Sequence, residues 1–285
     1  MSYIKLMRPK HYIKNFLVFL PLLFSGMFFD KNNILTCLLG FICFSLLAST
    51  IYIINDIKDK DKDKMHKTKF NRPIASGKVS VKNAIILDIL LITIIVLICI
   101  LGNFNALSIS LALLYFILNL IYSFGAKNIP ILDIIILVSG FFIRVLFGAT
   151  LLNITVSNWL YLTVIAISFY LGLGKRRNEI IKSGVNYRKV LKYYNKDFLD
   201  KNMYMCLTMT IVFYSLWTTD SVIVLKNNNL LIWTVPLIII IAMKYSMNIE
   251  GDSDGDPVEV IMKDKVLIAL GLIYMISLFV ILYLI

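Results

Sequence analysis

Four aspartates follow one another at short spacing, directly after a long apolar run, in the segment N-D-I-K-D-K-D-K-D-K that begins at Asn55. On a helix at about 100° per residue, Asp56, Asp59 and Asp63 fall within about 60° of one another, whereas Asp61 points elsewhere. Carboxylates that share one face repel each other unless a cation lies among them. Oxygen ligands suit Mg²⁺, which usually binds together with phosphate oxygens of a substrate. We therefore predict a metal site for a phosphorylated ligand. Its predicted metal ligands are Asn55, Asp56, Asp59 and Asp63.

Basic side chains follow these aspartates within the same loop. His66, Lys69 and Arg72 lead into R-P-I-A-S-G, where Pro73 must end a helix and Gly77 permits a turn. Such donors are what the remaining oxygens of a diphosphate require. They favour a binding site over the alternative, a solvated run in which Asp and Lys neutralise each other.

The composition indicates an integral membrane protein. Of the 285 residues, 59% are hydrophobic, and they form long unbroken runs without the alternation of barrel strands. We expect an all-α, polytopic fold with about nine transmembrane helices in one domain that covers 1–285. The expected spans lie near 13–29, 33–55, 82–101, 105–124, 129–151, 157–174, 203–220, 229–246 and 266–285.

The net charge of +12 would suit a nucleic-acid partner, but in a membrane protein the basic residues must first be sorted by side. All Lys and Arg residues except Lys31, Lys226 and Arg144 fall at polar ends on one side of the expected spans. The positive-inside rule then places the N-terminus and the loops near 56–81 and 175–202 in the cytoplasm. We expect contact with the bilayer and no nucleic acid.

Two polar groups lie at the mouths of the first two spans. Lys14 and Asn15 end the basic aromatic segment R-P-K-H-Y-I-K-N, which either anchors the chain among lipid headgroups or faces a polar pocket. Tyr52 precedes Asn55 by one helical turn, so we expect both on the same helix.

The loop after the fourth expected span carries Tyr122 and Lys127 on the same side of the membrane. Asp133 and Arg144 follow inside an apolar run, where an ionisable group must be paired or line a cavity. They are three turns apart, so direct pairing is doubtful. Both are expected to face the bundle interior, in either a structural or a site role.

The loop after the sixth expected span is strongly basic. It reads G-K-R-R-N-E-I-I-K-S-G, and Lys175, Glu179 and Lys182 share one helical face there. Arg176 and Arg188 add further donors. The loop either anchors the surface or binds phosphate, and the acidic loop expected on the same membrane face favours phosphate.

The segment G-D-P-V-E predicts the start of a helix. Asp256 is suited to the N-cap, Pro257 to the first turn, and Glu259 to the third position of a capping box.

The pattern N-D-x-x-D-x-x-x-D, from Asn55 to Asp63, resembles the first aspartate-rich motif of the UbiA superfamily of intramembrane prenyltransferases. That resemblance implies a nine-helix fold that binds a Mg²⁺-diphosphate substrate. A second such motif, expected after the sixth span, is replaced by G-K-R-R-N-E. This segment is similar to the decaprenyl-phosphate phosphoribosyltransferase branch, as are R-P-K-H-Y-I-K-N, H-K-T-K-F-N-R-P-I-A-S-G and G-D-P-V-E-V-I-M-K-D.

The resemblance implies Mg²⁺-dependent transfer of 5-phosphoribose from phosphoribosyl diphosphate (PRPP) to a polyprenyl phosphate in a bacterial plasma membrane. Three anionic groups on two substrates suit one acidic motif plus one basic loop. The expected catalytic residues are Asp56, Asp59 and Lys175. The expected substrate-binding residues are Lys14, Asn15, Tyr52, Asn55, Lys69, Arg72, Tyr122, Lys127, Lys175, Arg176, Glu179 and Arg188.

Two alternatives stay open. One is an ordinary UbiA-type prenyltransferase, which would share the acidic motif. The other is a transporter or membrane binding protein, although transporters usually place ionisable groups in the membrane and not in the loops. The oligomeric state is left open.

Overall fold

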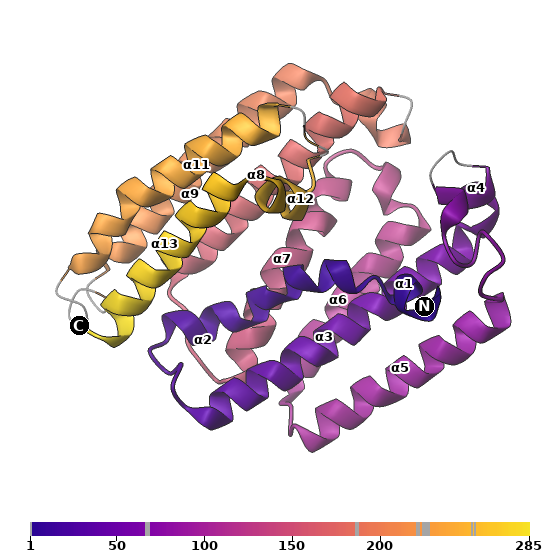
Figure 1. The fold of residues 1–285 in the computed structure, drawn as a ribbon, viewed down its shortest axis with the longest axis horizontal. Coiled ribbons are helices and arrows are strands. Elements are labelled where there is room, and N and C mark those ends of the chain that lie inside the picture. Colours follow the sequence, from indigo (N-terminus) through magenta and orange to yellow (C-terminus); the bar gives the residue numbers. More distant parts are fainter. Residues whose placement is uncertain are drawn as a thin grey trace. The chain divides into compact units, whose positions relative to one another are not determined.

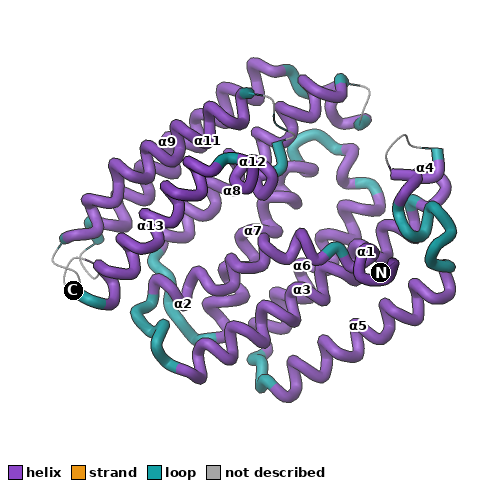
Figure 2. The backbone as a smooth tube through the Cα atoms, viewed as in Figure 1, coloured by secondary structure: helices purple, strands orange, loops and turns teal. Residues whose placement is uncertain are grey.

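The computed structural model describes residues 2–65, 69–185, 188–220, 223, 229–251, 253 and 255–285. Helices connected by short loops make up these residues, and no β-strand occurs among them (Figure 2). The predicted all-α fold class is therefore confirmed. The chain divides into two compact units: unit 1 holds residues 1–22, 27–124 and 143–154, and unit 2 holds 23–26, 125–142 and 155–285. The single domain over 1–285 stays a prediction.

Unit 1 is built around one long helix, α3 (Lys31–Lys58), which packs against α5 (Val81–Leu101) and α6 (Ala106–Phe124) (Figure 1). Its other elements are α1 (Ser2–Met7), η1 (Pro9–Phe19), α4 (Lys60–Lys64) and η2 (Lys69–Asn71). Two helices are divided between the units. Unit 1 contains α2 (Leu20–Phe24) up to Leu22, and it contains α7 (Leu132–Leu151) from Ile143 onward. The packing of α3 fixes its final turns, where the aspartates begin.

Local signals explain where α3 begins and why it is central. The carboxylate of Asp30 accepts the backbone N–H groups of Asn32 and Asn33 and so caps the first turn. The helix is apolar on every side, as expected of a buried helix. Phe44 and Leu47, for example, pack with Phe147 in the larger of two apolar clusters of unit 1.

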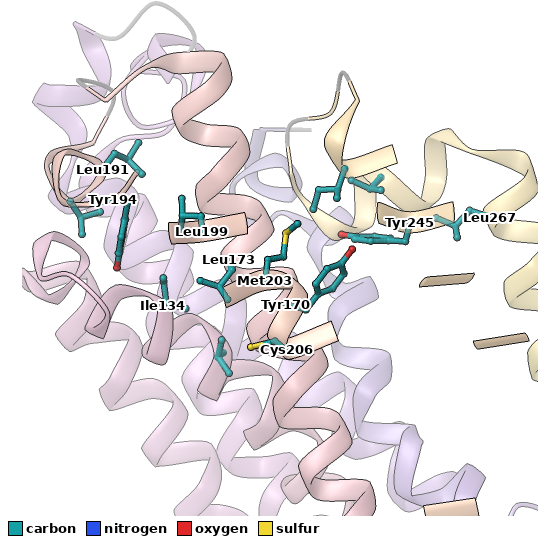
Figure 3. Close-up of a cluster of buried hydrophobic side chains, with 14 residues drawn as sticks. Ile134, Tyr170, Leu173, Leu191, Tyr194, Leu199, Met203, Cys206, Tyr245 and Leu267 are labelled. Carbon is teal, nitrogen blue, oxygen red and sulfur yellow. The ribbon is translucent and has the colours of Figure 1, made fainter. Parts of the chain in front are cut away.

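Unit 2 is built around the pair α8 (Asn158–Ser183) and α9 (Lys196–Thr218), which pack along each other. Figure 3 shows the apolar cluster between the elements of this unit, with Tyr170, Leu173 and Met203 among its buried members. The other elements are η3 (Ala126–Asn128), η4 (Lys189–Tyr193), η5 (Leu230–Thr234), α11 (Val235–Glu250), α12 (Pro257–Lys263) and α13 (Lys265–Tyr283), together with α7 up to Phe142.

Helices occupy all nine positions at which spans were predicted, but not all of them meet the requirements for crossing a bilayer. Within the described residues, six helical segments are long and apolar enough. They are Lys31–Lys58, Val81–Leu101, Ala106–Phe124, Leu132–Leu151, Leu230–Glu250 and Lys265–Tyr283. The span predicted at 13–29 is divided between η1 and α2, and those at 157–174 and 203–220 lie in α8 and α9. The count of nine spans is therefore not confirmed.

The surfaces of α5 and α13 are suited to lipid. Large apolar side chains such as Ile89 and Leu101 on α5, and Leu272 and Ile276 on α13, are more than half exposed. In water such a surface would drive association, but it is the expected surface of a helix in hydrocarbon. These helices make the chain an integral membrane protein, as predicted.

The close approach of α7 to η1 at Gly148 gives a test of the packing in unit 1. A methyl group on Gly148 of α7 would lie 2.0 Å from the carbonyl oxygen of Val18, and backbone cannot move aside easily. We expect Gly148→Ala to destabilise the protein by about 1–3 kcal/mol or more, seen as a lower midpoint of thermal unfolding in detergent. Gly271→Ala on α13 is the control, because nothing lies within 4 Å of the added methyl group. Equal midpoints for the two variants would contradict this packing.

Candidate active site

The aspartate segment of unit 1 forms the end of one helix and the start of the next. Helix α3 continues to Lys58, so Tyr52, Asn55 and Asp56 lie on the same helix, as predicted. Asp59 joins α3 to α4, and the backbone bonds Asp59 N to Asn55 O and Asp63 N to Asp59 O, 2.9 and 2.8 Å long, keep the helical register across the joint. The helical spacing used for the prediction therefore applies to the structure.

Two of the predicted metal ligands converge. Asp56 and Asp63 are buried, and one nitrogen of Arg72 lies 3.0 Å from Asp56 Oδ1 and 2.7 Å from Asp63 Oδ2. The two carboxylates are therefore neighbours. Asp61, by contrast, is 89% exposed and pairs only loosely with Lys64 at 3.4 Å. Exposed Asp61 is thus separated from buried Asp56 and Asp63, as the helical spacing predicted, and Arg72 of the following loop lies beside these two.

Arg8 is a residue of this cluster that the sequence did not single out. Its guanidinium lies 2.5 Å from Asp56 Oδ1 and 4.7 Å from the centre of the Tyr52 ring, where a cation–π contact forms. Its backbone is left-handed, with φ 56° and ψ 57°. A non-glycine residue in this region costs about 1–3 kcal/mol and is kept only where its surroundings determine it. The only signal in the sequence was its place before Pro9 in R-P-K-H-Y-I-K-N.

The donor set of this cluster fits a hard divalent cation. Asp56 Oδ2 is buried and has no hydrogen-bond partner among the described residues, an unusual state for a carboxylate oxygen unless a cation or donor joins it. Within the described ranges, no group of three or more His, Cys, Asp or Glu residues is placed to hold a metal ion, so Asp56, Asp59 and Asp63 do not form such a group. Mg²⁺ usually takes one or two carboxylates and completes its shell with water and phosphate.

The loop that supplies Arg72 is held in place by its apolar residues. Ile74 and Val79 are buried in the second apolar cluster of unit 1, together with Ile53 of α3. Lys69 begins η2 and is partly exposed. His66, which we expected among the donors, lies outside the described residues.

Asn15 and Arg144 form a separate buried network in unit 1. Arg144 Nε donates to Asn15 Oδ1 at 2.7 Å, and another guanidinium nitrogen donates to the Tyr115 hydroxyl at 2.9 Å. The amide of Asn15 donates in turn to Ser45 Oγ at 2.9 Å. Asn15 is 0% exposed, so in this structure its amide contacts protein on both sides. A role of Asn15 in substrate binding stays a prediction, as it does for the partly exposed Lys14 and Tyr122.

In unit 2 the carboxylate of Asp133 is bound by Arg176 and Tyr194, which lie far from it in the sequence. Arg176 Nε donates to Asp133 Oδ2 at 2.5 Å, and both side chains are buried. The Tyr194 hydroxyl donates to the other oxygen at 2.7 Å and accepts the backbone N–H of Ile131 at 2.5 Å. Ile131 has φ 67°, a strained value for a β-branched residue. Burial, and then the hydrogen bond to Asp133, raise the pKa of Tyr194, so the phenol remains a donor.

The basic end of α8 separates into buried and reachable side chains. Arg176 is 1% exposed and also contacts Glu179 at 2.8 Å, whereas Arg188 is 26% exposed and lies 3.4 Å from Glu179. Lys175 is 28% exposed and lies 3.6 Å from Asp256. Lys127 of η3 is partly exposed. Lys175, Arg188 and Lys127 are therefore partly exposed, whereas Arg176 is buried between Asp133 and Glu179.

The helix start predicted at G-D-P-V-E is confirmed in its main feature. Asp256 caps α12 by accepting the backbone N–H of Val258 at 3.1 Å, and Pro257 is the first residue of the helix. Glu259, expected to complete a capping box, lies 3.3 Å from Lys263.

Comparison with known proteins now gives the family. Unit 1 carries a carboxylate–arginine cluster at a helix end, and the chain is an integral membrane protein of helices. The model of the UbiA prenyltransferase family matches residues 17–262, and the chain belongs to this family.

Similar proteins include the decaprenyl-phosphate phosphoribosyltransferases of Corynebacterium glutamicum and Mycolicibacterium smegmatis. The first is 32% identical over 94% of this chain and 83% of its own length, and the second is 34% identical over 93% and 87%. Both resemblances drawn from the motifs are thereby confirmed.

Solved structures agree on the fold. The structure of a UbiA homolog from Archaeoglobus fulgidus bound to GPP and Mg²⁺ superposes with a TM-score of 0.72 at 18% identity and covers 99% of both chains. A digeranylgeranylglyceryl phosphate synthase superposes with a TM-score of 0.63 at 19% identity, over 100% of this chain and 98% of that one.

The buried pair of Arg176 and Asp133 gives a stability test. Removing one partner of such a pair leaves an uncompensated charge and destabilises by about 3–5 kcal/mol. We expect this loss for Arg176→Met, measured as a lower unfolding midpoint in detergent. Lys192→Met, at an exposed position of η4, is the control. An unchanged midpoint for Arg176→Met would show that the pair contributes nothing to stability.

Proposed function

We propose that this protein transfers 5-phosphoribose from PRPP to a polyprenyl phosphate, and that the reaction depends on Mg²⁺. The relatives named decaprenyl-phosphate phosphoribosyltransferase, which match nearly the whole chain, support this assignment. We also place the N-terminus and both charged loops in the cytoplasm of a bacterium, since nearly all basic residues lie on that side of the spans.

The observation that carries the proposal is the division of charge between two segments. Arginines pair with carboxylates in both segments, but in the α3–α4 segment both arginines of Asp56 lie on Oδ1, and the buried Oδ2 has no hydrogen-bond partner among the described residues. At the end of α8, arginines occupy both oxygens of Glu179, Arg176 and Tyr194 occupy those of Asp133, and Asp200 pairs with Arg177. That end is therefore suited to phosphate and not to a second metal, which favours PRPP over a prenyl diphosphate.

The acidic residues take the diphosphate end of PRPP. Asp56, Asp59 and Asp63, with Asn55 beside them, would hold Mg²⁺, and the ion would offset the negative charge that accumulates on the departing diphosphate. Arg72 lies against Asp56 and Asp63, and Arg8 lies against Asp56. Each arginine has further N–H groups that can donate to phosphate oxygens. Tyr52 keeps Arg8 in place through its ring.

The basic residues take the other anionic groups. Lys175 and Arg188 are partly exposed, and together with Lys69 and Lys127 they bind the 5-phosphate and the acceptor phosphate. Arg176, buried between Asp133 and Glu179, orients the end of α8 and does not itself meet the substrate.

The bond changes need no strong general base. The bond from the ribose C1 to the diphosphate oxygen breaks, the diphosphate leaves with the electron pair, and an oxygen of the acceptor phosphate forms the new bond to C1. The acceptor is already an anion near neutral pH. Charge develops on the sugar as in glycoside chemistry, so positioning and electrostatics by the residues above supply most of the catalysis.

The assay that tests this function uses the purified protein in detergent with labelled PRPP, a polyprenyl phosphate and Mg²⁺. We expect label to move into the lipid phase, and we expect a chelator to stop this transfer, because the carboxylate cluster needs a cation to accept a diphosphate. Omission of the lipid is the control. Absence of labelled lipid with protein that is shown to be folded would refute the proposal.

A second candidate is prenyl transfer, because similar structures bind GPP and Mg²⁺ and the acidic cluster would serve either diphosphate. The same protein is therefore incubated with a prenyl diphosphate and an aromatic acceptor. Turnover of this pair alone would replace phosphoribosyl transfer by prenyl transfer.

Site variants test the residue assignments. We expect Asp59→Ala to lower transfer by roughly a hundredfold or more, the usual loss when a group that stabilises developing charge is removed. We expect Lys175→Ala to lower transfer as well, because a charged donor to a substrate phosphate is lost. Asp61→Ala is the matched control for the first, because Asp61 lies in the same segment but is exposed. Lys192→Ala is the control for the second. Full activity in both site variants, with unchanged unfolding midpoints, would remove these residues from the site.

A further inference from the structure

The segment G-D-P-V-E, which is one of the motifs of the chain but has no part in the chemistry above, lies directly against the basic end of α8. A methyl group on Gly255 would lie 2.9 Å from the Cα of Lys175 and 3.2 Å from the carbonyl oxygen of Gly174. Gly255 also has φ +73°, a conformation that glycine adopts without strain. The α11–α12 loop, described at residues 251, 253, 255 and 256, is thus in contact with the backbone of α8 at Gly174 and Lys175.

Asn178 fastens this loop to α8. Its amide nitrogen lies 2.7 Å from the carbonyl oxygen of Ile249, 3.1 Å from that of Ser253 and 3.0 Å from Ser253 Oγ. Ser253 Oγ also accepts the backbone N–H of Gly255 at 3.1 Å. Asn178 and Ser253 are both buried. These bonds fix the loop at the residue that precedes Asp256.

The orientation of the Asn178 amide is itself determined. Arg177, also buried, donates to Asn178 Oδ1 at 3.1 Å and pairs with Asp200 of α9. Because the oxygen accepts from Arg177, the amide nitrogen must face the loop. In G-K-R-R-N-E, Arg177 and Asn178 therefore hold the α11–α12 loop, while Lys175 stays partly exposed beside it.

The two oxygens of Asp256 have different partners. Oδ1 accepts the N–H of Val258 and caps α12, whereas Oδ2 lies 3.6 Å from Lys175 Nζ. We propose that Asp256 is a positioning residue, which orients the ammonium group of Lys175 toward a phosphate of PRPP. Capping requires only an oxygen acceptor, but orienting a lysine requires the charge. The proposal rests on the role of Lys175 as a phosphate ligand.

Unit 2 contains a matched control for this arrangement. Asp264 caps α13 by accepting the N–H groups of Val266 and Leu267 with Oδ1, and its Oδ2 lies 2.8 Å from Lys244 of α11. The hydrogen bond from Lys244 lowers the pKa of Asp264. Asp264 thus repeats the cap and the ion pair of Asp256 with a lysine that has no part in the proposed site.

The experiment measures equilibrium binding of PRPP with Mg²⁺ by calorimetry in detergent, without lipid acceptor, so that no turnover occurs. Asp256→Asn keeps the cap but removes the charge, whereas Asp256→Glu keeps the charge but is a poor cap. We expect Asp256→Asn to weaken PRPP binding roughly tenfold, within the range of coupling between residues in contact. Asp256→Glu should bind nearly as the wild type does, and Asp264→Asn should not change binding.

A double variant separates positioning from a general effect on the fold. If Asp256 acts through Lys175, Asp256→Asn adds no further loss in the Lys175→Gln background. Additive losses, a larger loss for Asp256→Glu than for Asp256→Asn, or tighter binding by Asp256→Asn would each overturn the proposal. The last result would mean that the carboxylate only competes with the phosphate. A wild-type protein that does not bind PRPP would instead refute the proposed function, on which this inference depends.

Discussion

Arg72 bridges the carboxylates of Asp56 and Asp63, and the acidic segment of this protein depends on that contact. Two buried carboxylates side by side repel each other unless positive charge lies between them. Arg72 supplies it at 3.0 and 2.7 Å, and Arg8 adds a second guanidinium on Asp56. The two arginines thus offset the repulsion between the carboxylates, and guanidinium groups are also suited to the phosphate oxygens that accompany Mg²⁺.

The end of α8 in unit 2 also contains buried charges that must be neutralised, but here the buried charges are positive. Arg176 and Arg177 are buried, and a buried charge must be paired. Asp133 and Asp200 pair with them, and through Asn178 the second pair also fixes the α11–α12 loop. Lys175 in the same motif keeps a partly exposed ammonium group. A run of adjacent basic residues therefore contains two kinds: arginines that hold the protein together and a lysine that remains available.

Much of this could be predicted from the sequence, because some of its signals are local. A period of 3.6 residues separated Asp61 from Asp56 and Asp63, and Asp256 before Pro257 marked a helix start. The apolar runs located the helices, but the count of nine spans was too simple, since composition does not tell whether the run at 13–29 forms one helix or is divided between η1 and α2. The role of Arg8 could not be predicted, because it requires a left-handed backbone before a proline.

Residues far apart in sequence form the ion pairs that neutralise some of these charged side chains. A local motif therefore does not show which of its basic residues are already paired within the protein. Arg176 pairs with Asp133, which lies 43 positions away in the sequence. Without that contact, nothing in G-K-R-R-N-E distinguishes its first arginine from a phosphate ligand. The division between metal and phosphate chemistry follows from the same contacts. Glu179 has a guanidinium on each of its two oxygens, whereas Asp56 has both of its guanidinium partners on Oδ1 and keeps Oδ2 without a partner among the described residues. The carboxylates of Asp133, Glu179 and Asp200 are thus occupied within the protein, and this neutralisation by internal pairing, more than the number of basic residues, distinguishes the end of α8 from a second aspartate-rich motif.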